Sequence, residues 1–197
     1  MIAMGKVARS FFQTDPLTCA RALIGCELVW GPTAGIIVET EAYSEIGDEA
    51  CHTFLRRHAR AFIRDHPAGS LYVYLNYGVH WLLNLLVRGG GANGFVLIRA
   101  LQPGSGLELM RQRRRTDKLE ALCSGPGKLT QALAIDGNIH GKDLFALPDA
   151  AVYSRRGEPE IETDQRIGIT KSAALEWRFL AKGSRFVSVG KARPREV

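Results

Sequence analysis

Apolar residues recur at helical spacing in two segments that flank the middle of the chain. The first begins at Pro16, after a candidate N-cap at Thr14 or Asp15, and its apolar positions are Leu17, Ala20, Leu23 and Ile24. The second begins in the stretch 124–128, and its apolar positions are Leu129, Ala132 and Leu133. Both patterns predict short amphipathic helices.

Strand-like patterns occupy the region between these segments. The run 35–43, β-branched at its start, predicts a strand on which one face carries Ile37, Glu39, Glu41 and Tyr43. The apolar runs 71–75 and 79–87 flank the turn residues 76–78, which predicts a hairpin with Tyr77 at its tip. A further strand is predicted over 95–101, and shorter strands over 166–170 and 185–189.

The remaining segments have weaker patterns. Ser105 and Glu108 have the spacing of a capping box ahead of an arginine-rich helix. The segment 45–65 predicts helix fragments and loop, and the glycines at 89–91 predict a flexible loop because they lack the context of a nucleotide-binding motif. The 197 residues suit one domain. We therefore expect a single α+β domain over 1–197 with a curved, mostly antiparallel sheet, flanking helices and a protruding β-hairpin.

Positive charge is the strongest feature of the composition. The chain has 26 Lys and Arg against 20 Asp and Glu, a formal net charge of +6, which makes a polyanionic partner such as nucleic acid plausible. The charge gathers in two groups: Arg56, Arg57, Arg60 and Arg64, and then Arg111, Arg113, Arg114, Arg115 and Lys118. Either group could equally be the solvated face of a helix.

The apolar segments are too short for a membrane protein, because none approaches the ~20 residues that cross a bilayer. The stretch 1–9 lacks the apolar core of a signal peptide, and the four cysteines have no paired spacing. We expect buried, unpaired cysteines and a cytoplasmic protein, associated with the nucleoid if the source is bacterial.

Glu39 and Glu41 are the first candidates for chemistry. Residues two apart on a strand point the same way at roughly 6–7 Å, a separation that suits general acid/base catalysis, although strand carboxylates are more often merely solvated. Four of the five tyrosines lie in the predicted strands and turn, where they could line a nucleobase pocket or be ordinary sheet aromatics.

Asn84 interrupts an apolar strand, so it either pins a turn or faces a pocket, because a buried amide needs hydrogen-bond partners. The five histidines do not have the spacing of a metal site. We expect no metal and no other cofactor.

Taken together, several motifs resemble the alkyladenine (3-methyladenine) DNA glycosylase family. They are VETEAY at 38–43, DEACH at 48–52, LYVY at 71–74, YG at 77–78, VLIRAL at 96–101 and CSGPGKL at 123–129. Their order and spacing cover nearly the whole chain, and the combination is far more specific than any one motif. The resemblance implies an enzyme that flips a damaged purine out of duplex DNA and hydrolyses its N-glycosidic bond without strand cleavage.

The resemblance also implies individual roles. Glu41 matches the catalytic general base, and Arg99 matches the arginine that helps to hold the attacking water and the DNA backbone. The flipped base would stack between Tyr43 on one face and His52 and Tyr74 on the other. Asn84 would crowd the exocyclic amine of normal guanine. The implied DNA-binding residues are Tyr77, which would fill the gap left in the duplex, and Arg113 and Arg114 of the basic cluster.

The chain departs from the family pattern in the stretch 57–65, at Gln102 and at 79–81, so the resemblance does not define its DNA contacts and its substrate range there. Two other classes of protein remain open. A non-catalytic nucleic-acid binding module would explain the charge and the tyrosines, and a carbohydrate hydrolase would use Glu39 with Glu41. We expect a monomer that acts on double-stranded DNA containing a damaged purine.

Overall fold

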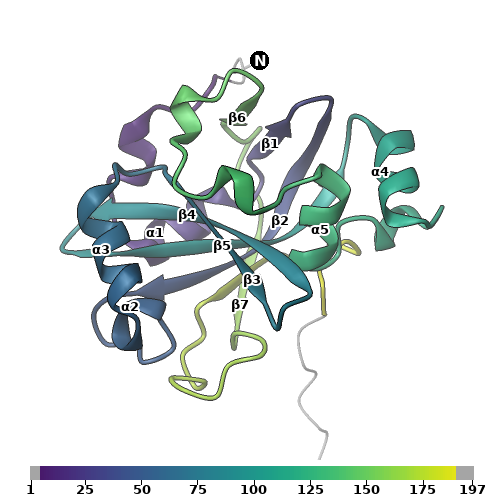
Figure 1. Cartoon of the computed structure of the whole chain (residues 1–197). Helices are drawn as coiled ribbons and strands as arrows, with labels where there is room; N and C mark the ends of the chain where they lie inside the picture. Colours follow the sequence, from purple (N-terminus) through teal and green to yellow (C-terminus); the bar gives the residue numbers. More distant parts are fainter. Residues whose placement is uncertain (1–4, 190–197) are drawn as a thin grey trace, which may run out of the picture.

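An eight-stranded sheet runs through the centre of the computed structural model, which describes residues 5–189 (Figure 1). Its main path has the order β3-β4-β5-β2-β1-β6, while β8 pairs with β2 and β7 with β8, and every pairing is antiparallel. The strands are β1 (Glu27–Trp30), β2 (Thr33–Ser44), β3 (Leu71–Asn76), β4 (His80–Gly89), β5 (Ala92–Pro103), β6 (Ala150–Tyr153), β7 (Ile161–Asp164) and β8 (Arg178–Ala181).

Within the described residues, five short α-helices flank the sheet. They are α1 (Pro16–Leu23), α2 (His52–Leu55), α3 (Arg57–Asp65), α4 (Leu107–Arg114) and α5 (Pro126–Leu133). Four 3₁₀ turns lie at Arg9–Phe12, Leu119–Ala121, Gly137–Ile139 and Leu144–Ala146. In Figure 1, α2 and α3 lie at one end of the long strands and α4 and α5 at the other. The predicted α+β fold is confirmed.

The first helix begins where the sequence places it. The side chain of Asp15 accepts hydrogen bonds from the backbone N–H groups of Leu17 and Thr18, so Asp15 and not Thr14 is the N-cap. Helices α1 and α5 both contribute buried residues to the main core, which they share with the sheet. The apolar spacing therefore identified the packing face of both helices correctly.

Strand β2 contains an irregularity that the alternating pattern does not reveal. Its pairing with β5 shifts register between Ile37 and Thr40, as in a β-bulge. As a result Ile37 packs in the main core together with Ala42, while Tyr43 packs in a second cluster on α3 and β3. The expectation that Ile37 shares a face with Glu41 and Tyr43 is therefore wrong, because one extra residue reverses the alternation.

Local sequence signals also failed at the start of α4 and in the glycine turn. The N-cap of α4 is Gly106, at φ 72°, and no side chain caps the helix, so the capping box of Ser105 and Glu108 does not form. A Cβ at Gly106 would lie 2.5 Å from the carbonyl oxygen of Pro32, so the backbone packs too closely there for another residue. The glycines at 89–91 lie at the tight turn between β4 and β5, where Gly89 and Gly90, but not Gly91, pack on the backbone of residues 13–15.

The two strands expected near the C-terminus are also wrong. Residues 166–170 and 185–189 lie outside regular strands, and the strands of this region are β7 and β8 instead. Short apolar runs among glycines do not distinguish a strand from a loop held by side-chain hydrogen bonds. These loops prove to contact the carboxylates of β2.

The predicted hairpin is confirmed as β3 and β4, with Tyr77 in its turn. Both Tyr77 (φ 50°) and Gly78 (φ 69°) have left-handed backbone conformations, and the N–H of Val79 donates to the carbonyl of Asn76 at 3.0 Å. A tyrosine in this conformation carries a backbone cost of roughly 1 kcal/mol or more. The side chain is nevertheless 87% exposed, so packing does not repay that cost.

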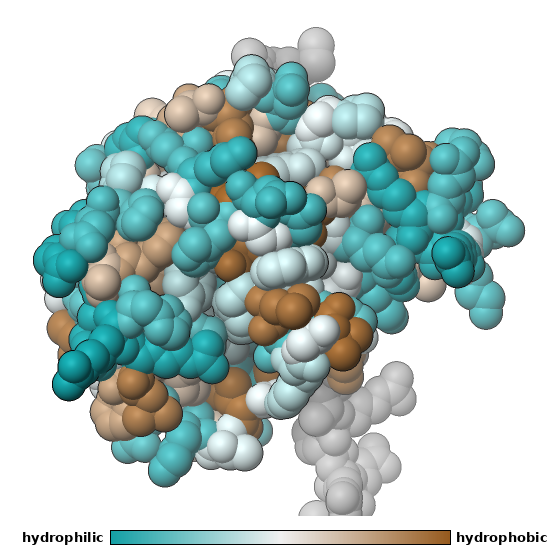
Figure 2. Space-filling view, viewed as in Figure 1, coloured by the Kyte–Doolittle hydropathy of each residue, from teal (hydrophilic) through white to brown (hydrophobic). Residues whose placement is uncertain are grey.

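The face of the molecule in Figure 2 is mainly hydrophilic, with apolar patches over the β3–β4 hairpin and over α2. The exposed large apolar residues include Leu75, Tyr77 and Val79 on the hairpin and Phe54 and Leu55 on α2. Among residues 5–189, no helix has the length and hydropathy to span a membrane.

Candidate active site

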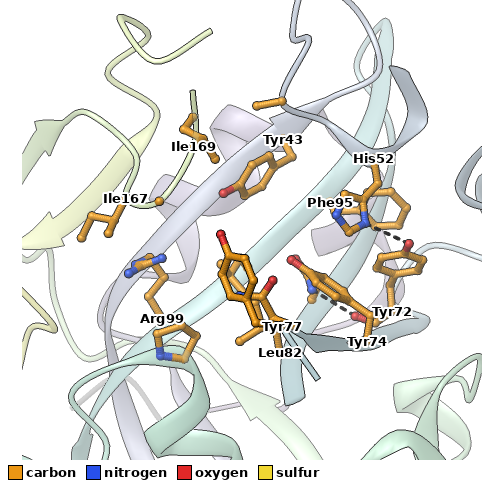
Figure 3. A pocket seen from close by; sticks show the side chains of 16 residues that line it. Tyr43, His52, Tyr72, Tyr74, Tyr77, Leu82, Phe95, Arg99, Ile167 and Ile169 are labelled. Atoms are coloured by element: carbon orange, nitrogen blue, oxygen red, sulfur yellow. Dashed lines mark hydrogen bonds between the residues drawn. The ribbon is translucent and has the colours of Figure 1, made fainter. Parts of the chain in front are cut away.

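A cavity of about 300 Å³ opens between the β3–β4 hairpin, strands β2 and β5, and the loop that follows β7 (Figure 3). Its wall combines aromatic and aliphatic side chains with polar groups, among them His52, Asn84 and Arg99. The lining residues include Tyr43, His52, Tyr72, Tyr74, Tyr77, Leu82, Asn84, Phe95, Leu97, Arg99, Ile167 and Ile169. The structure thus brings together every residue of the expected base pocket, Tyr43, His52, Tyr74 and Asn84, from three strands and a helix.

The two ends of the cavity differ in chemistry. Figure 3 shows Arg99 and Ile167 together at one end and His52, Tyr72 and Phe95 together at the other. At the aromatic end, His52 lies 4.6 Å from Tyr74 between ring centroids, and Tyr72 stacks on Phe95 at 4.4 Å. A flat ligand that enters between these groups would meet rings on its sides and a cation at one edge.

His52 is fixed by its neighbours in the neutral form. Its Nδ1 lies 3.0 Å from the hydroxyl of Tyr72, with which it shares a hydrogen bond. Burial, with smaller contributions from Arg56 and His58, lowers the pKa of His52 to about 4. Burial also raises the pKa values of Tyr72 and Tyr74 to about 12, so all three side chains are uncharged at neutral pH.

Glu41 lies directly behind the polar end of the cavity and is fully buried. Three groups that line the cavity donate to its carboxylate: the hydroxyl of Tyr43 (2.8 Å) and Nη1 of Arg99 (3.2 Å) to Oε2, and the backbone N–H of Ile167 (2.7 Å) to Oε1. Burial, and then the charge of Glu41, raise the pKa of Tyr43 well above its ordinary value, which keeps this hydroxyl a donor. The carboxylate is therefore held rigidly beside the cavity.

Glu39 does not line the cavity. It lies instead at the centre of a network of buried ion pairs and hydrogen bonds. Arg99 donates to Oε1 through Nε (3.0 Å), and Arg178 of β8 donates to the same oxygen through Nη1 (3.1 Å). Ser188 adds its backbone N–H (2.6 Å to Oε2) and its hydroxyl (2.8 Å to Oε1). Burial alone would lower the pKa of Arg99, but the charges of Glu41 and Glu39 outweigh it and raise that pKa.

Asn84 faces the cavity from the middle of β4, so it does not pin a turn. Its side chain is buried, and Nδ2 donates to the carbonyl of Tyr72 at 3.1 Å on the neighbouring strand. This bond fixes the amide in one orientation toward a ligand. Leu82 and Leu97 flank it in the wall.

The expected DNA-binding arginines lie on α4, away from the cavity. Arg113 donates to the carbonyl of Ala132 at 2.9 Å, and Arg114 donates to the carbonyl of Leu122 at 3.1 Å and to Gln131. Both side chains are half-buried, and these hydrogen bonds join α4 to neighbouring segments. Exposed arginines also lie at the N-cap of α3, Arg56, and on α3 itself, at Arg57, Arg60 and Arg64.

Three members of the site had no signal in the sequence. Ile167 acts through its backbone N–H, which every residue type except proline offers, and Arg178 and Ser188 bond to Glu39 across 139 and 149 residues of chain.

Among residues 5–189, no group of three or more His, Cys, Asp or Glu side chains could hold a metal ion. All four cysteines are buried and unpaired, as expected.

The network predicts which glutamate stabilises the fold more. Glu39→Gln should lower the free energy of unfolding by about 3–5 kcal/mol, because it leaves Arg99 and Arg178 buried with one anion fewer. Glu41→Gln should cost less, because within residues 5–189 Glu41 pairs with Arg99 alone. Urea unfolding of both variants, with the surface variant Glu160→Gln as a control, measures the difference. A larger loss in Glu41→Gln would contradict this account.

The low pKa of His52 predicts a pH dependence of stability. Between pH ~6.5, the ordinary histidine value, and its folded pKa of about 4, the unfolded chain binds a proton that folded His52 does not. Stability should therefore fall as the pH is lowered through that window, and His52→Gln should reduce the slope. Unfolding free energies from pH 7.5 to 4.5 measure it, with the exposed His58→Gln as the matched control. An unchanged slope in His52→Gln would show that His52 is readily protonated in the folded protein.

Comparison with known proteins gives one family over most of the chain. Residues 10–185 match the model of the family described as methylpurine-DNA glycosylase. A relative from Agrobacterium fabrum is 48% identical over 183 residues, covering 93% of this chain and 92% of the relative. One from Prosthecochloris aestuarii is 42% identical over 200 residues, covering 97% and 94%. Both carry the provisional name 3-methyladenine DNA glycosylase. The chain therefore belongs to the methylpurine-DNA glycosylase family, whose members are DNA glycosylases, hydrolases of N-glycosyl bonds.

Proposed function

We propose that this protein hydrolyses the N-glycosidic bond of a damaged purine that has been flipped out of duplex DNA, using water activated by Glu41 and leaving the strand intact. One observation carries the proposal: a buried carboxylate with three fixed donors stands directly behind an aromatic cavity. The substrates we propose are alkylated, deaminated and etheno purines.

The cavity suits a single base. Its volume of about 300 Å³ is at the lower end of the range for small-ligand pockets. Tyr43 would stack on one face of the base, and His52 with Tyr74 on the other. A base within the helix cannot reach such a cavity, so it must leave the stack at a cost of a few kcal/mol, which is least for a damaged or weakly paired base. Selection of damaged purines thus begins before the bond is broken.

Cleavage needs a nucleophile and stabilisation of positive charge. As the bond to the purine breaks, its electron pair leaves with the base and the sugar becomes cationic, which the anionic Glu41 stabilises. Water adds to the sugar carbon and gives its proton to Glu41. Among the residues that the structure describes, Oε1 accepts only from Ile167, which leaves it a lone pair for that proton. Glu41 is fully buried, so the proposed mechanism requires the donors that line the cavity to move slightly when water reaches the carboxylate.

The substrate range follows from the leaving group and from Asn84. Cationic alkylpurines leave readily, whereas neutral hypoxanthine or an etheno adduct needs a hydrogen bond or a proton. The fixed amide of Asn84 would meet the exocyclic amine of normal guanine and exclude it.

No matched lysine is available for a Schiff base, so we propose water as the nucleophile and no strand cleavage.

DNA would be held at the mouth of the cavity by stacking and by charge. Tyr77 projects from the hairpin turn and would take the place of the flipped base. Arg99, through the family resemblance, and Arg113 and Arg114 are proposed to contact the backbone, which carries no sequence information. We propose that the protein acts as a monomer on double-stranded DNA, without a metal or cofactor.

The proposal predicts that Glu41→Gln loses excision while it keeps binding. The amide preserves shape but removes the base and the negative charge, so single-turnover release of hypoxanthine or an alkylated purine from a duplex in EDTA should fall ~10²–10⁴-fold. Affinity for lesion DNA should stay within about threefold, less than the ~1.4 kcal/mol of a tenfold change. Glu160→Gln, on the surface, should match wild type. Full activity in Glu41→Gln would overturn the role of Glu41, and a wild type that binds but releases no base would favour a binding module.

The second prediction concerns the hairpin. Tyr77→Ala should slow excision from duplex DNA by roughly 5–100-fold, as the loss of one base–aromatic stack of ~1–3 kcal/mol implies. Excision from single-stranded lesion DNA should change much less, because there is no stack to fill. Tyr77→Phe keeps the ring and serves as the matched control. Equal losses on both substrates, or a melting temperature several degrees lower, would make Tyr77 a structural residue.

A further inference from the structure

Arg166 lies behind the cavity in an unusual environment. Its side chain is fully buried, with the guanidinium carbon 4.7 Å from the ring centroid of Tyr43 and 5.2 Å from that of Trp177. Arg166 does not line the cavity, whereas Tyr43 does. The cation therefore covers the face of the Tyr43 ring that is turned away from the cavity.

Asp48 holds the guanidinium in this position. Nη1 and Nη2 of Arg166 donate to its two carboxylate oxygens at 2.6 and 2.8 Å, and Nη1 also donates to the carbonyl of Ala42 at 2.9 Å. Asp48 is fixed in turn by the backbone N–H groups of Ser44 and Ala50. The ion pair thus connects the loop after β7 to the loop after β2, and the bond to Ala42 connects it to the strand that carries Tyr43.

Stability alone does not explain this arrangement. Buried ion pairs often contribute no more to stability than apolar residues of the same volume. In addition, Nε of Arg166 is buried and has no acceptor in the part of the chain that the structure describes, a cost that well-packed interiors avoid. What the guanidinium does achieve is a fixed positive charge against an aromatic ring.

We propose that Arg166 is a specificity-determining residue that biases the cavity against positively charged alkylpurines and in favour of neutral damaged purines. The inference rests on the proposed function, in which the other face of Tyr43 stacks on the flipped base. A cation on one face of a ring draws its π electrons toward itself, so the opposite face attracts a second cation less. A cationic base stacked there would also lie roughly 8 Å from the guanidinium and be repelled by it.

Asp48 weakens the effect of Arg166 on the preference between cationic and neutral bases. The direction in which that preference changes can therefore be tested by removing the charges separately. The carboxylate offsets the charge of Arg166, so removing Asp48 alone leaves the ring beside an uncompensated cation. Removing both charges leaves the ring free to attract a cationic base. The two changes act on the same contacts but should shift the preference in opposite directions, which a purely structural role would not do.

The experiment compares single-turnover release of 3-methyladenine, which is cationic in DNA and lacks the 2-amino group of guanine, and of neutral hypoxanthine from otherwise identical duplexes. Relative to wild type, the double variant Arg166→Met with Asp48→Asn should raise the ratio of the two rates roughly threefold to tenfold, the size of one cation–π contact. Asp48→Asn alone should lower the ratio by a similar factor. Arg166→Lys keeps the charge and should hold the ratio within about twofold.

Folding is checked by circular dichroism, and Asp48→Asn provides the test if the double variant fails to fold. Equal changes on both substrates, or shifts of the ratio in the same direction in both variants, would overturn the role of Arg166 and leave the proposed function standing. A folded wild type that releases neither base would overturn the proposed function, and this inference with it.

Discussion

The insertion of Arg99 between Glu39 and Glu41 is the interaction on which the site depends. Two ionised carboxylates on one strand, both without solvent exposure, would oppose folding unless cations compensate them. Arg99 from the adjacent strand bonds to both, and Arg178 adds a second cation to Glu39. Because the guanidinium is planar and its donors are rigidly placed, the bond to Glu39 through Nε also sets the direction in which Nη1 meets Glu41. Glu41, the proposed general base, is therefore positioned through Arg99 by Glu39, which does not line the cavity.

Irregular backbone makes this arrangement possible. The bulge in β2 changes the register against β5 at Glu39, close to where the outer edge of β2 passes from pairing with β1 to pairing with β8. The change of partner brings Arg178 beside Glu39. A regular strand paired throughout with β1 would present the same carboxylates to a different set of neighbours. The strained turn at Tyr77 is a second case, in which the backbone conformation directs a side chain outward.

The sequence predicted those parts of the molecule whose causes are local. The Asp15–Pro16 start of α1 and the turn residues around Tyr77 depend on a few adjacent positions, and both were correct. The motif residues Tyr43, His52, Tyr74, Asn84 and Arg99 also meet at one cavity, as the family resemblance implied. Gly106 replaced the capping box because of a close approach to Pro32, which no local pattern encodes. The backbone of Ile167 and the distant Ser188 were missed for the same reason, since their partners are set by tertiary packing.

The pairing of β8 with β2 also has a consequence for biosynthesis. The β2 glutamates leave the ribosome early, but Arg178 follows Glu39 by 139 residues and the backbone N–H of Ser188 follows it by 149. Until those residues emerge, a nascent chain that collapsed around β2 and β5 would hold two acids against one base in its interior. Completion of the sheet is thus coupled to the arrival of the last tenth of the described chain. Premature termination before β8 should leave an aggregation-prone fragment with no partly active enzyme, since such contacts between distant segments form late in folding.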